Sequence, residues 1–308
     1  MTGWRLVSDV GGTNVRFARA AGGGLFALQA YPVSRFASFS EAVRAYLDET
    51  GGKGGCIGAA IGAAGLVAFG KVSLTNMAWE ISEAHVSDEL GAPCRIINDV
   101  EAVAFSVSGI SGAGFAAIGP LSPDLTAMHR ILVANIGTGF GASALIRADG
   151  AWVSCPSEAG HMSLNFPDWP DIDMQRRFPS VEHVLSGRGL CNLHAAISKA
   201  ATPCAAAADI FNRAGTDPHC AAALRLFTQI AGNVLGNLVL AVAAWDGVYL
   251  CGSVARSLAK TADLAVFRQA FEGTGRMSAW MKRVPVALLT EEYPALAGLA
   301  VLPLRTSR

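Results

Sequence analysis

The residues best suited to chemistry begin with the turn Asp9-Val-Gly-Gly-Thr13, which follows an apolar run and continues into Asn14. Glycine backbone there can leave N–H groups free to donate to phosphate oxygens, and the Thr13 hydroxyl adds a further donor. The Asp9 carboxylate can hold a hydrated Mg²⁺ that spreads charge over the same phosphates. A plain hairpin turn is the alternative, because Gly-Gly and Thr-Asn are also ordinary turn residues.

A second glycine-rich stretch, Gly137-Thr-Gly-Phe-Gly-Ala142, formally matches the dinucleotide fingerprint. That fingerprint requires a helix to follow, yet Ser143–Arg147, the turn Asp149-Gly150 and Ala151–Val153 predict strand, turn, strand. We therefore interpret these glycines as a second phosphate-binding turn inside a hairpin. Two such turns, each opening a strand meander, predict a duplicated domain with phosphates held between its halves.

A pair of polar residues, Asn98-Asp99, ends a short apolar strand just before the helical run Ala102–Val107. Ligand sites in α/β proteins form at the carboxyl ends of strands, so Asp99 is a candidate site residue. The alternative role for Asp99 is a helix N-cap.

Three more polar side chains are candidate binding residues. Glu158 and His161 are separated by a glycine-containing step, and Glu182 opens a helical turn. Carboxylate and imidazole groups on such backbone can share hydrogen bonds with neighbouring sugar hydroxyls, whereas the Glu158–His161 pair is too few for a metal site. A solvated surface pair is the alternative for Glu158 and His161.

The strand-to-helix turn Gly252-Ser253 consists of small residues on which a flat base or ribose could lie. A tight connection between strand and helix explains the same residues equally well.

The composition favours a small-molecule enzyme in the cytoplasm. The chain has 308 residues, enough for two medium domains, and its 24 basic and 24 acidic residues give a net charge of +0. Such a balance gives no excess of basic residues that would attract nucleic acid or an anionic membrane. Seven scattered cysteines without zinc-type spacing indicate reduced thiols. The N-terminus lacks the apolar core of a signal peptide.

The uncharged run Leu226–Trp245 is about as long as a bilayer-spanning helix. Gln229, Asn233 and Asn237 recur at i, i+4 spacing and place a polar stripe on one helix face. We therefore expect a buried helix of a soluble domain, with close packing at Gly232 and Gly236.

The elements that must position these residues alternate between strands and helices. We expect strands at Val15–Ala20, Leu25–Tyr31, Cys56–Gly62, Thr126–Ile136 and Val284–Leu289. Expected helices cover Phe39–Glu49, Ser82–Leu90, the alanine-rich Ala195–Ala223 and Pro294–Leu302.

In chain order the motifs resemble those of the bacterial glucokinase family, within the sugar kinase/actin/heat-shock ATPase superfamily. They read DVGGTN with Arg16, LTNMAW, INDVEA, GTGFG, SEAGH, EHVLSGRGL and GVYLCGS. The Cys-rich zinc motif of the related repressor/open-reading-frame/kinase branch is absent from the sequence.

The resemblance implies an α/β fold of two ribonuclease-H-like (actin-like ATPase) domains, with mixed sheets flanked by helices and a cleft between them. The small domain would comprise residues 1–109 plus about 290–308, and the large domain residues 110–289. It also implies ATP-dependent phosphorylation of the glucose 6-hydroxyl to glucose 6-phosphate, the first step of glycolysis. A homodimer is a further expectation of the family.

The resemblance also assigns roles to residues. Asp99 would be the general base. The sugar hydroxyls would be held by Asn76, Asn98, Asp99, Glu158, His161 and Glu182. Phosphates and Mg²⁺ would face Asp9, Gly11, Gly12, Thr13, Asn14, Gly137, Thr138 and Gly139, with Asp9 holding the metal through water. Gly252 and Ser253 would face the adenosine.

Three departures from the family pattern bear on sugar selectivity: Gly62 in place of proline, Leu66 in place of a polar residue, and Ser157 with Ala159 in a loop that usually reads Gly-Glu-Gly-Gly-His. A broader-specificity hexokinase or glucomannokinase, a non-catalytic sugar sensor, and an actin-fold ATPase acting on proteins are the alternatives. The sensor has no chemical need for both Asp9 and Asp99, and the protein-directed ATPase has no need for the hydroxyl partners.

Overall fold

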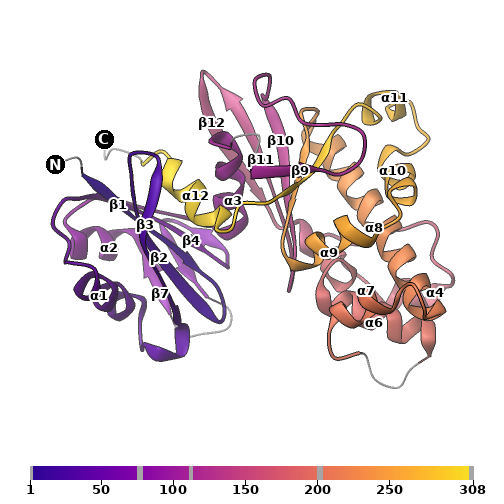
Figure 1. Cartoon of the computed structure of the whole chain (residues 1–308), viewed down its shortest axis with the longest axis horizontal. Coiled ribbons are helices and arrows are strands. Elements are labelled where there is room, and N and C mark those ends of the chain that lie inside the picture. Colours follow the sequence, from indigo (N-terminus) through magenta and orange to yellow (C-terminus); the bar gives the residue numbers. More distant parts are fainter. Residues whose placement is uncertain (1–2, 75–78, 111–113, 200–203, 305–308) are drawn as a thin grey trace. The chain divides into compact units, whose positions relative to one another are not determined.

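The computed structural model describes residues 3–74, 79–110, 114–199 and 204–304 (Figure 1). The chain divides into two compact units. Unit 1 comprises Met1–Ile110 with Glu291–Arg308, and unit 2 comprises Ser111–Thr290.

The main sheet of unit 1 has five strands in the order β3-β2-β1-β4-β8. β1, β2 and β3 form an antiparallel meander, whereas β4 and β8 run parallel to β1. The strands span β1 (Trp4–Val10), β2 (Asn14–Ala21), β3 (Gly24–Pro32), β4 (Cys56–Ala63) and β8 (Cys94–Asn98). The strands predicted at the first meander and at Cys56–Gly62 are confirmed within a few residues.

Helix α1 (Phe39–Glu49) lies where the sequence predicted it, because Ser38 accepts a hydrogen bond from the Glu41 N–H as N-cap and a glycine-rich run follows. Unit 1 also contains η1 (Val33–Arg35), α2 (Glu83–Leu90), α3 (Asp99–Ser108) and α12 (Pro294–Val301). A small second sheet joins β5 (Val67–Ala68), β6 (Lys71–Ser73) and β7 (Glu80–Ser82).

The last helix of the chain is part of the unit that begins it, and Figure 1 shows α12 beside α3. At Gly298 a Cβ atom would lie only 1.8 Å from the carbonyl oxygen of Ala102, so the two helix backbones touch directly. The guanidinium of Arg5 on β1 donates to the carbonyls of Leu299 and Leu302 at 3.1 and 2.6 Å. These bonds satisfy carbonyl groups at the end of α12 that have no partner within the helix.

Unit 2 repeats the same strand order in the sheet β12-β11-β10-β13-β14-β9. β10, β11 and β12 form an antiparallel meander, and β13 and β14 run parallel to β10. The bounds are β9 (Phe115–Ala117), β10 (Arg130–Ile136), β11 (Phe140–Ala148), β12 (Ala151–Ser157), β13 (Val248–Cys251) and β14 (Val286–Leu289). The arrangement matches the duplicated meander that the glycine turns predicted.

Nine helical segments of unit 2 lie in its described part: η3 (Ala159–His161), α4 (Ile172–Arg177), α5 (Val181–Val184), α6 (Gly187–Ser198), α7 (Ala207–Arg213), α8 (Pro218–Val242), α9 (Ser253–Thr261), α10 (Leu264–Glu272) and α11 (Ser278–Met281). The prediction of one largely helical region over Ala195–Ala223 is wrong in part. α6 ends where Lys199 adopts a left-handed conformation, and α8 begins only after the N-cap Asp217. Residues 200–203 lie outside the described residues.

α8 has the length and composition of a membrane-spanning helix, but more than half of its most apolar window is buried within the protein. Gly232 and Gly236 lie against α10, where added Cβ atoms would meet the carbonyl oxygens of Phe267 and Phe271 at 2.5 and 2.4 Å. The close packing predicted for these glycines is confirmed. On the neighbouring face, the Asn237 amide donates to Asn233 at 3.3 Å.

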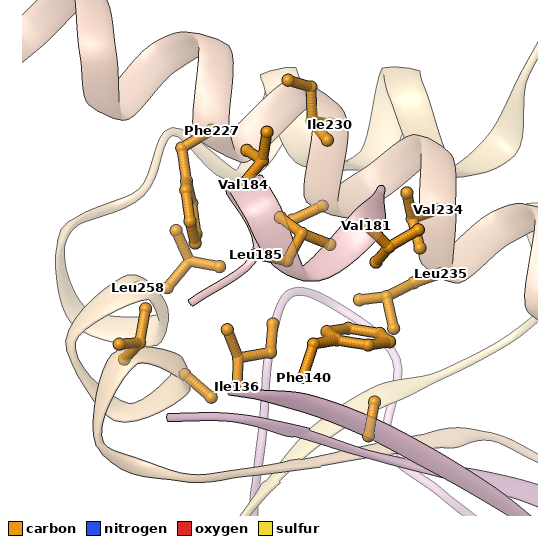
Figure 2. Close-up of a cluster of buried hydrophobic side chains, with 14 of the residues drawn as sticks. Ile136, Phe140, Val181, Val184, Leu185, Phe227, Ile230, Val234, Leu235 and Leu258 are labelled. Atoms are coloured by element: carbon orange, nitrogen blue, oxygen red, sulfur yellow. The ribbon is translucent and has the colours of Figure 1, made fainter. Parts of the chain in front are cut away.

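The core of unit 2 lies beneath its glycine-rich turn. Figure 2 shows Ile136 and Phe140, which flank that turn, together with buried side chains of α5, α8 and α9. The labelled members are Val181, Val184, Leu185, Phe227, Ile230, Val234, Leu235 and Leu258. The turn is thus supported by close-packed apolar side chains.

Candidate functional site

The first glycine-rich turn connects β1 to β2 in unit 1. The N–H of Gly11 donates to the carbonyl of Asn14 at 3.0 Å, and the carbonyl of Thr13 accepts from the N–H of Val33 at 2.9 Å. Gly12 and Thr13 at the tip are exposed. The turn is therefore anchored at its base while its tip offers N–H and hydroxyl donors to solvent.

Asp9 lies at the end of β1, beside this turn. Its Oδ2 accepts a hydrogen bond from Arg16 at 3.1 Å, across the β1–β2 pair. Burial raises the pKa of Asp9, and the adjacent guanidinium opposes that rise. A carboxylate oxygen beside exposed N–H donors is the hard ligand that Mg²⁺ prefers, so this residue fits the metal that the family implies.

Asn98, and not Asp99, is the N-cap of α3. Its Oδ1 accepts from the N–H groups of Val100 and Glu101 at 2.9 and 3.4 Å, and the Glu101 carboxylate accepts from the N–H of Asn98. Asp99 is the first helical residue, and its Oδ1 accepts from Val100 N–H at 2.9 Å. A carboxylate in the first turn of a helix faces the positive end of the helix dipole.

Strand register brings Asp9 and Asp99 to one edge of the unit 1 sheet. Asp9 pairs with Gly62 of β4, and Gly62 pairs with Ile97 of β8. Two strand spacings therefore separate the two carboxylate-bearing strands, a distance of about 10 Å. At Gly62 a Cβ would lie 3.1 Å from the Cβ of Ala102, so glycine lets α3 approach the sheet closely.

The second glycine-rich turn joins β10 to β11 in unit 2, as predicted. The N–H of Gly137 donates to the carbonyl of Gly139 at 3.0 Å, and Thr138 between them is exposed. The Oε2 of Glu182 accepts from the N–H of Phe140 at 2.8 Å. Glu182 is therefore fixed to the turn by one oxygen.

Glu158 directly precedes the 3-10 turn η3 and His161 ends it, and both side chains are exposed. The His161 Nε2 lies 3.9 Å from the Glu158 Oε2. Between them, a Cβ at Gly160 would lie 2.5 Å from the carbonyl oxygen of Phe140, which requires glycine where this loop meets β11. The loop thus presents a carboxylate and an imidazole next to the turn that carries Glu182.

A cavity of about 360 Å³ lies where the Gly137 turn meets the start of α9. At Gly252, φ is 97° and an added Cβ would lie 2.4 Å from the Ile136 carbonyl oxygen, so only glycine fits there. The cavity is lined by Gly137, Thr138, Gly187, Arg188, Ala207, Ala208, Phe211, Ser253, Val254 and Ser257.

The structure groups the predicted site residues by unit. Unit 1 carries Asp9, Gly11, Gly12, Thr13, Asn14, Asn98 and Asp99, at the carboxyl ends of β1 and β8, in the turn after β1, or at the first residue of β2 or α3. Unit 2 carries Gly137, Thr138, Gly139, Glu158, His161, Glu182, Gly252 and Ser253. Asn76 lies outside the described residues.

Some cavity-lining residues were not predicted from the sequence. Gly187 and Arg188 belong to the motif that supplied Glu182, and the N–H of Gly187 donates to the Gly137 carbonyl at 2.8 Å. The sequence signal available for these two residues was a glycine at the start of a helix, directly after the N-cap residue Ser186. Phe211 on α7 carries no such signal, because an apolar side chain on a helix is ordinarily core.

Comparison with known proteins assigns the family. A family model described as Glucokinase matches residues 6–305. This chain belongs to the glucokinase family. Among relatives in the family, the glucokinase of Nitrobacter hamburgensis is 34% identical, with 99% of this chain and 98% of that protein covered. The glucokinase of Chromohalobacter salexigens is also 34% identical, with 97% of each chain covered.

Solved structures of glucokinases share the fold. The crystal structure of a glucokinase from an Antarctic psychrotroph aligns with a TM-score of 0.81 at 28% identity, covering 97% of this chain and 98% of that one. A glucokinase from Balamuthia mandrillaris in complex with glucose aligns with a TM-score of 0.76 at 19% identity, covering 97% and 92%, and supports the fold alone. The predicted α/β class is confirmed.

Proposed function

We propose that this member of the glucokinase family transfers the γ-phosphoryl group of ATP to the 6-hydroxyl of glucose, with Asp99 as the general base. The observation that carries the proposal is the position of Asp99. Its carboxylate stands at the first turn of α3, at the sheet edge that also bears Asp9, while Asn98 caps the helix.

In this reaction the carboxylate of Asp99 accepts the hydroxyl proton as the sugar oxygen bonds to phosphorus and ADP departs. Phosphoryl transfer asks a protein mainly for positioning and charge stabilisation. The N–H donors at Gly12 and Thr13, and those at Thr138 and Gly139, would hold phosphate oxygens. Mg²⁺, when bound near Asp9 through water, supplies further charge neutralisation.

The adenosine would occupy the cavity beside Gly252 and Ser253. Its volume of about 360 Å³ is within the range of small-ligand pockets, and backbone approaches closely there because both turns are glycine-rich. The family resemblance and the cavity together support ATP as the phosphoryl donor.

The sugar hydroxyls would be held by Asn98 and Asp99 of unit 1 and by Glu158, His161 and Glu182 of unit 2, with Asn76 as a further partner. Glu182 retains Oε1 for a hydroxyl because its Oε2 accepts from Phe140. The exposure of Glu158 and His161 leaves both groups accessible to a ligand.

Three wider features complete the proposal: a cytoplasmic location, a homodimer, and a place at the first step of glycolysis. The balanced charge of the chain and its free cysteines support the location. Light scattering at several protein concentrations would measure the oligomeric state.

The test is ADP release measured with Mg²⁺-ATP and a panel of hexoses, on the wild type, on Asp99→Asn and on Asp88→Asn. Asparagine retains an oxygen that can accept from the Val100 N–H, so the helix start is preserved. Asp88 is an exposed carboxylate on α2 of the same unit and serves as the matched control.

We expect glucose-dependent release that falls on the order of 10²–10⁴-fold in Asp99→Asn and is unchanged in Asp88→Asn. ADP release at the same rate with and without each sugar would favour an ATPase. Absence of release despite thermal stabilisation by glucose would favour a sensor, and equal rates with several hexoses would favour a broader hexokinase.

A further inference from the structure

A cluster of potential metal ligands lies in unit 2, outside the residues assigned to substrate. His194 of α6, the N-cap Asp217 and Cys220 of α8 each offer one ligand atom, and these atoms all lie within 4.8 Å of one another. Cys220 is buried, and His194 and Asp217 are half-buried. Two different helices thus supply nitrogen, oxygen and sulfur donors to one place.

Two further thiols, on α6 and on the segment after it, lie close to each other. The Sγ of Cys204, just before α7, lies 2.7 Å from the Sγ of Cys191. Cys191 is three residues before His194 on α6, so both side chains project from the same face of that helix. Sulfur donors therefore come from α6, α8 and the segment between α6 and α7.

His194 has an unusual environment for a structural histidine. Within the described part of the chain, its Nδ1 atom is buried and has no hydrogen-bond partner. Buried polar atoms are nearly always paired, because they lose their hydrogen bonds to water. A cation coordinated by this nitrogen would supply the missing partner.

We propose that His194, Cys220 and Asp217, together with a thiol of the Cys191–Cys204 pair, bind one divalent metal ion of the zinc class. Zinc takes four such ligands in a tetrahedral arrangement, with bonds of about 2.0–2.3 Å that place neighbouring ligand atoms about 3.5 Å apart. The ligand atoms of His194, Asp217 and Cys220 already lie within 4.8 Å of one another and need only small rotamer changes to reach that geometry.

Asp217 has a second role that the experiment must respect. Its Oδ1 accepts from the N–H groups of His219 and Cys220 at 2.9 and 3.3 Å, and its Oδ2 pairs with Arg213. The carboxylate is therefore the ligand most easily replaced by the second thiol. His194 and Cys220 are the ligands on which the proposal depends.

A disulfide between Cys191 and Cys204 is the competing explanation for the close thiols. It would use two of the five donors and leave the buried His194 Nδ1 without a partner. A metal ion would use the imidazole, Cys220 and one of the two thiols, and so the unpartnered His194 Nδ1 favours the metal.

The site would connect α6, α7 and α8. α6 begins with Gly187, and α7 carries Ala207 and Phe211, all of which line the 360 Å³ cavity. A bound ion would therefore hold two walls of that cavity, so its removal should weaken nucleotide binding as well as stability.

The experiment measures metal on the full chain, purified under reducing conditions. Stripped protein is titrated with Zn²⁺ and with Co²⁺, whose thiolate complexes absorb in the near ultraviolet. His194→Gln and Cys220→Ser remove proposed ligands. Cys155→Ser, which changes an exposed cysteine outside the cluster, is the control. Thermal unfolding of the wild type with Zn²⁺ and with a chelator gives a readout that does not depend on the variants folding.

We expect one Zn²⁺ per chain, a thiolate–cobalt absorption band, and a melting temperature that rises with Zn²⁺ and falls with chelator. Zinc affinity should fall at least about 100-fold in both ligand variants and stay unchanged in Cys155→Ser. Equal zinc binding by all four proteins would overturn the proposal. A wild type that binds no zinc would also overturn the proposal. The same holds if the wild type binds no zinc and mild oxidation forms a disulfide between Cys191 and Cys204.

Discussion

The contact between Gly298 and Ala102 gives a sharp test of how the base is positioned. Gly298→Ala would place a methyl carbon 1.8 Å from a backbone carbonyl oxygen of α3, whereas ordinary contacts begin near 3.4 Å. A backbone atom cannot rotate away, so α12 and α3 must separate by more than 1 Å. Ala102 is one turn from Asp99, and the displacement therefore reaches the proposed base.

Two opposing free-energy terms set the change in stability caused by Gly298→Ala. Alanine stabilises an isolated helix by about 1 kcal/mol relative to glycine. Forcing a methyl group into a close-packed contact costs about 1–3 kcal/mol and occasionally more. With backbone at this distance the steric cost is at the upper end. We expect a net loss of about 2 kcal/mol and a lower melting temperature, by about 4–8 °C. A shift of about 1 Å at Asp99 should reduce kcat/KM for glucose on the order of 10²-fold.

Gly109→Ala is the matched control. It adds the same methyl group between the same helices, but its nearest neighbour, a methyl group of Val301, would lie at an ordinary 3.6 Å. Chemical denaturation and steady-state kinetics on both variants make the comparison. Unfolding midpoints and kcat/KM that are the same in Gly298→Ala, Gly109→Ala and wild type would refute the argument.

Three further substitutions test other contacts. Gly252→Ala should raise KM for ATP roughly tenfold, because the added Cβ would lie 2.4 Å from the Ile136 carbonyl oxygen and must displace the turn beside the cavity; unchanged nucleotide titrations would contradict this. Glu182→Ala leaves the Phe140 N–H unpaired and should cost about 1–3 kcal/mol in denaturation experiments, whereas Glu182→Gln, which keeps an acceptor, should restore stability without restoring kcat/KM for glucose. Tyr31 donates to Glu49 at 2.5 Å and lowers the pKa of Glu49 below its ordinary 4.5. The folding free energy from this bond is complete above pH 4.5 and is lost as pH falls through the lowered pKa of Glu49. Tyr31→Phe should therefore be less stable than wild type near neutral pH and equally stable in acid. A difference in stability that stays constant over a pH series would disprove the linkage.

The local structure of the site was largely predictable, because each part carries its own signal. Ser38 and the glycines after Glu49 define α1, and the Asp149-Gly150 turn identified the GTGFG glycines as part of a hairpin. The choice of cap at α3 was not predictable. Asn98 and Asp99 are both good capping residues, and only the hydrogen bonds to Asn98 decide between them.

Contacts between segments that are distant in the sequence could not be predicted from it. The cysteines and histidine of the proposed metal site stand at Cys191, His194, Cys204 and Cys220, without the paired spacing of a zinc motif. Only the packing of α6 against α8 brings His194 and Cys220 together. Helix propensity likewise predicted one long helical region where Asp217 starts a new helix, because alanine-rich sequence carries no information about where tertiary structure interrupts it.

The position of α12 has a consequence for synthesis. Unit 1 starts the chain, yet the helix that covers α3 and whose carbonyls Arg5 binds is made last. At ~5–20 residues per second, a ribosome needs on the order of ten seconds or more to translate the intervening segment 111–290. The apolar faces that await α12 must stay exposed on the nascent chain throughout that interval, whereas unit 2 has all its strands by the end of it. A stop codon just after Thr290 would therefore damage the unit farthest from it in sequence and spare the nearer one.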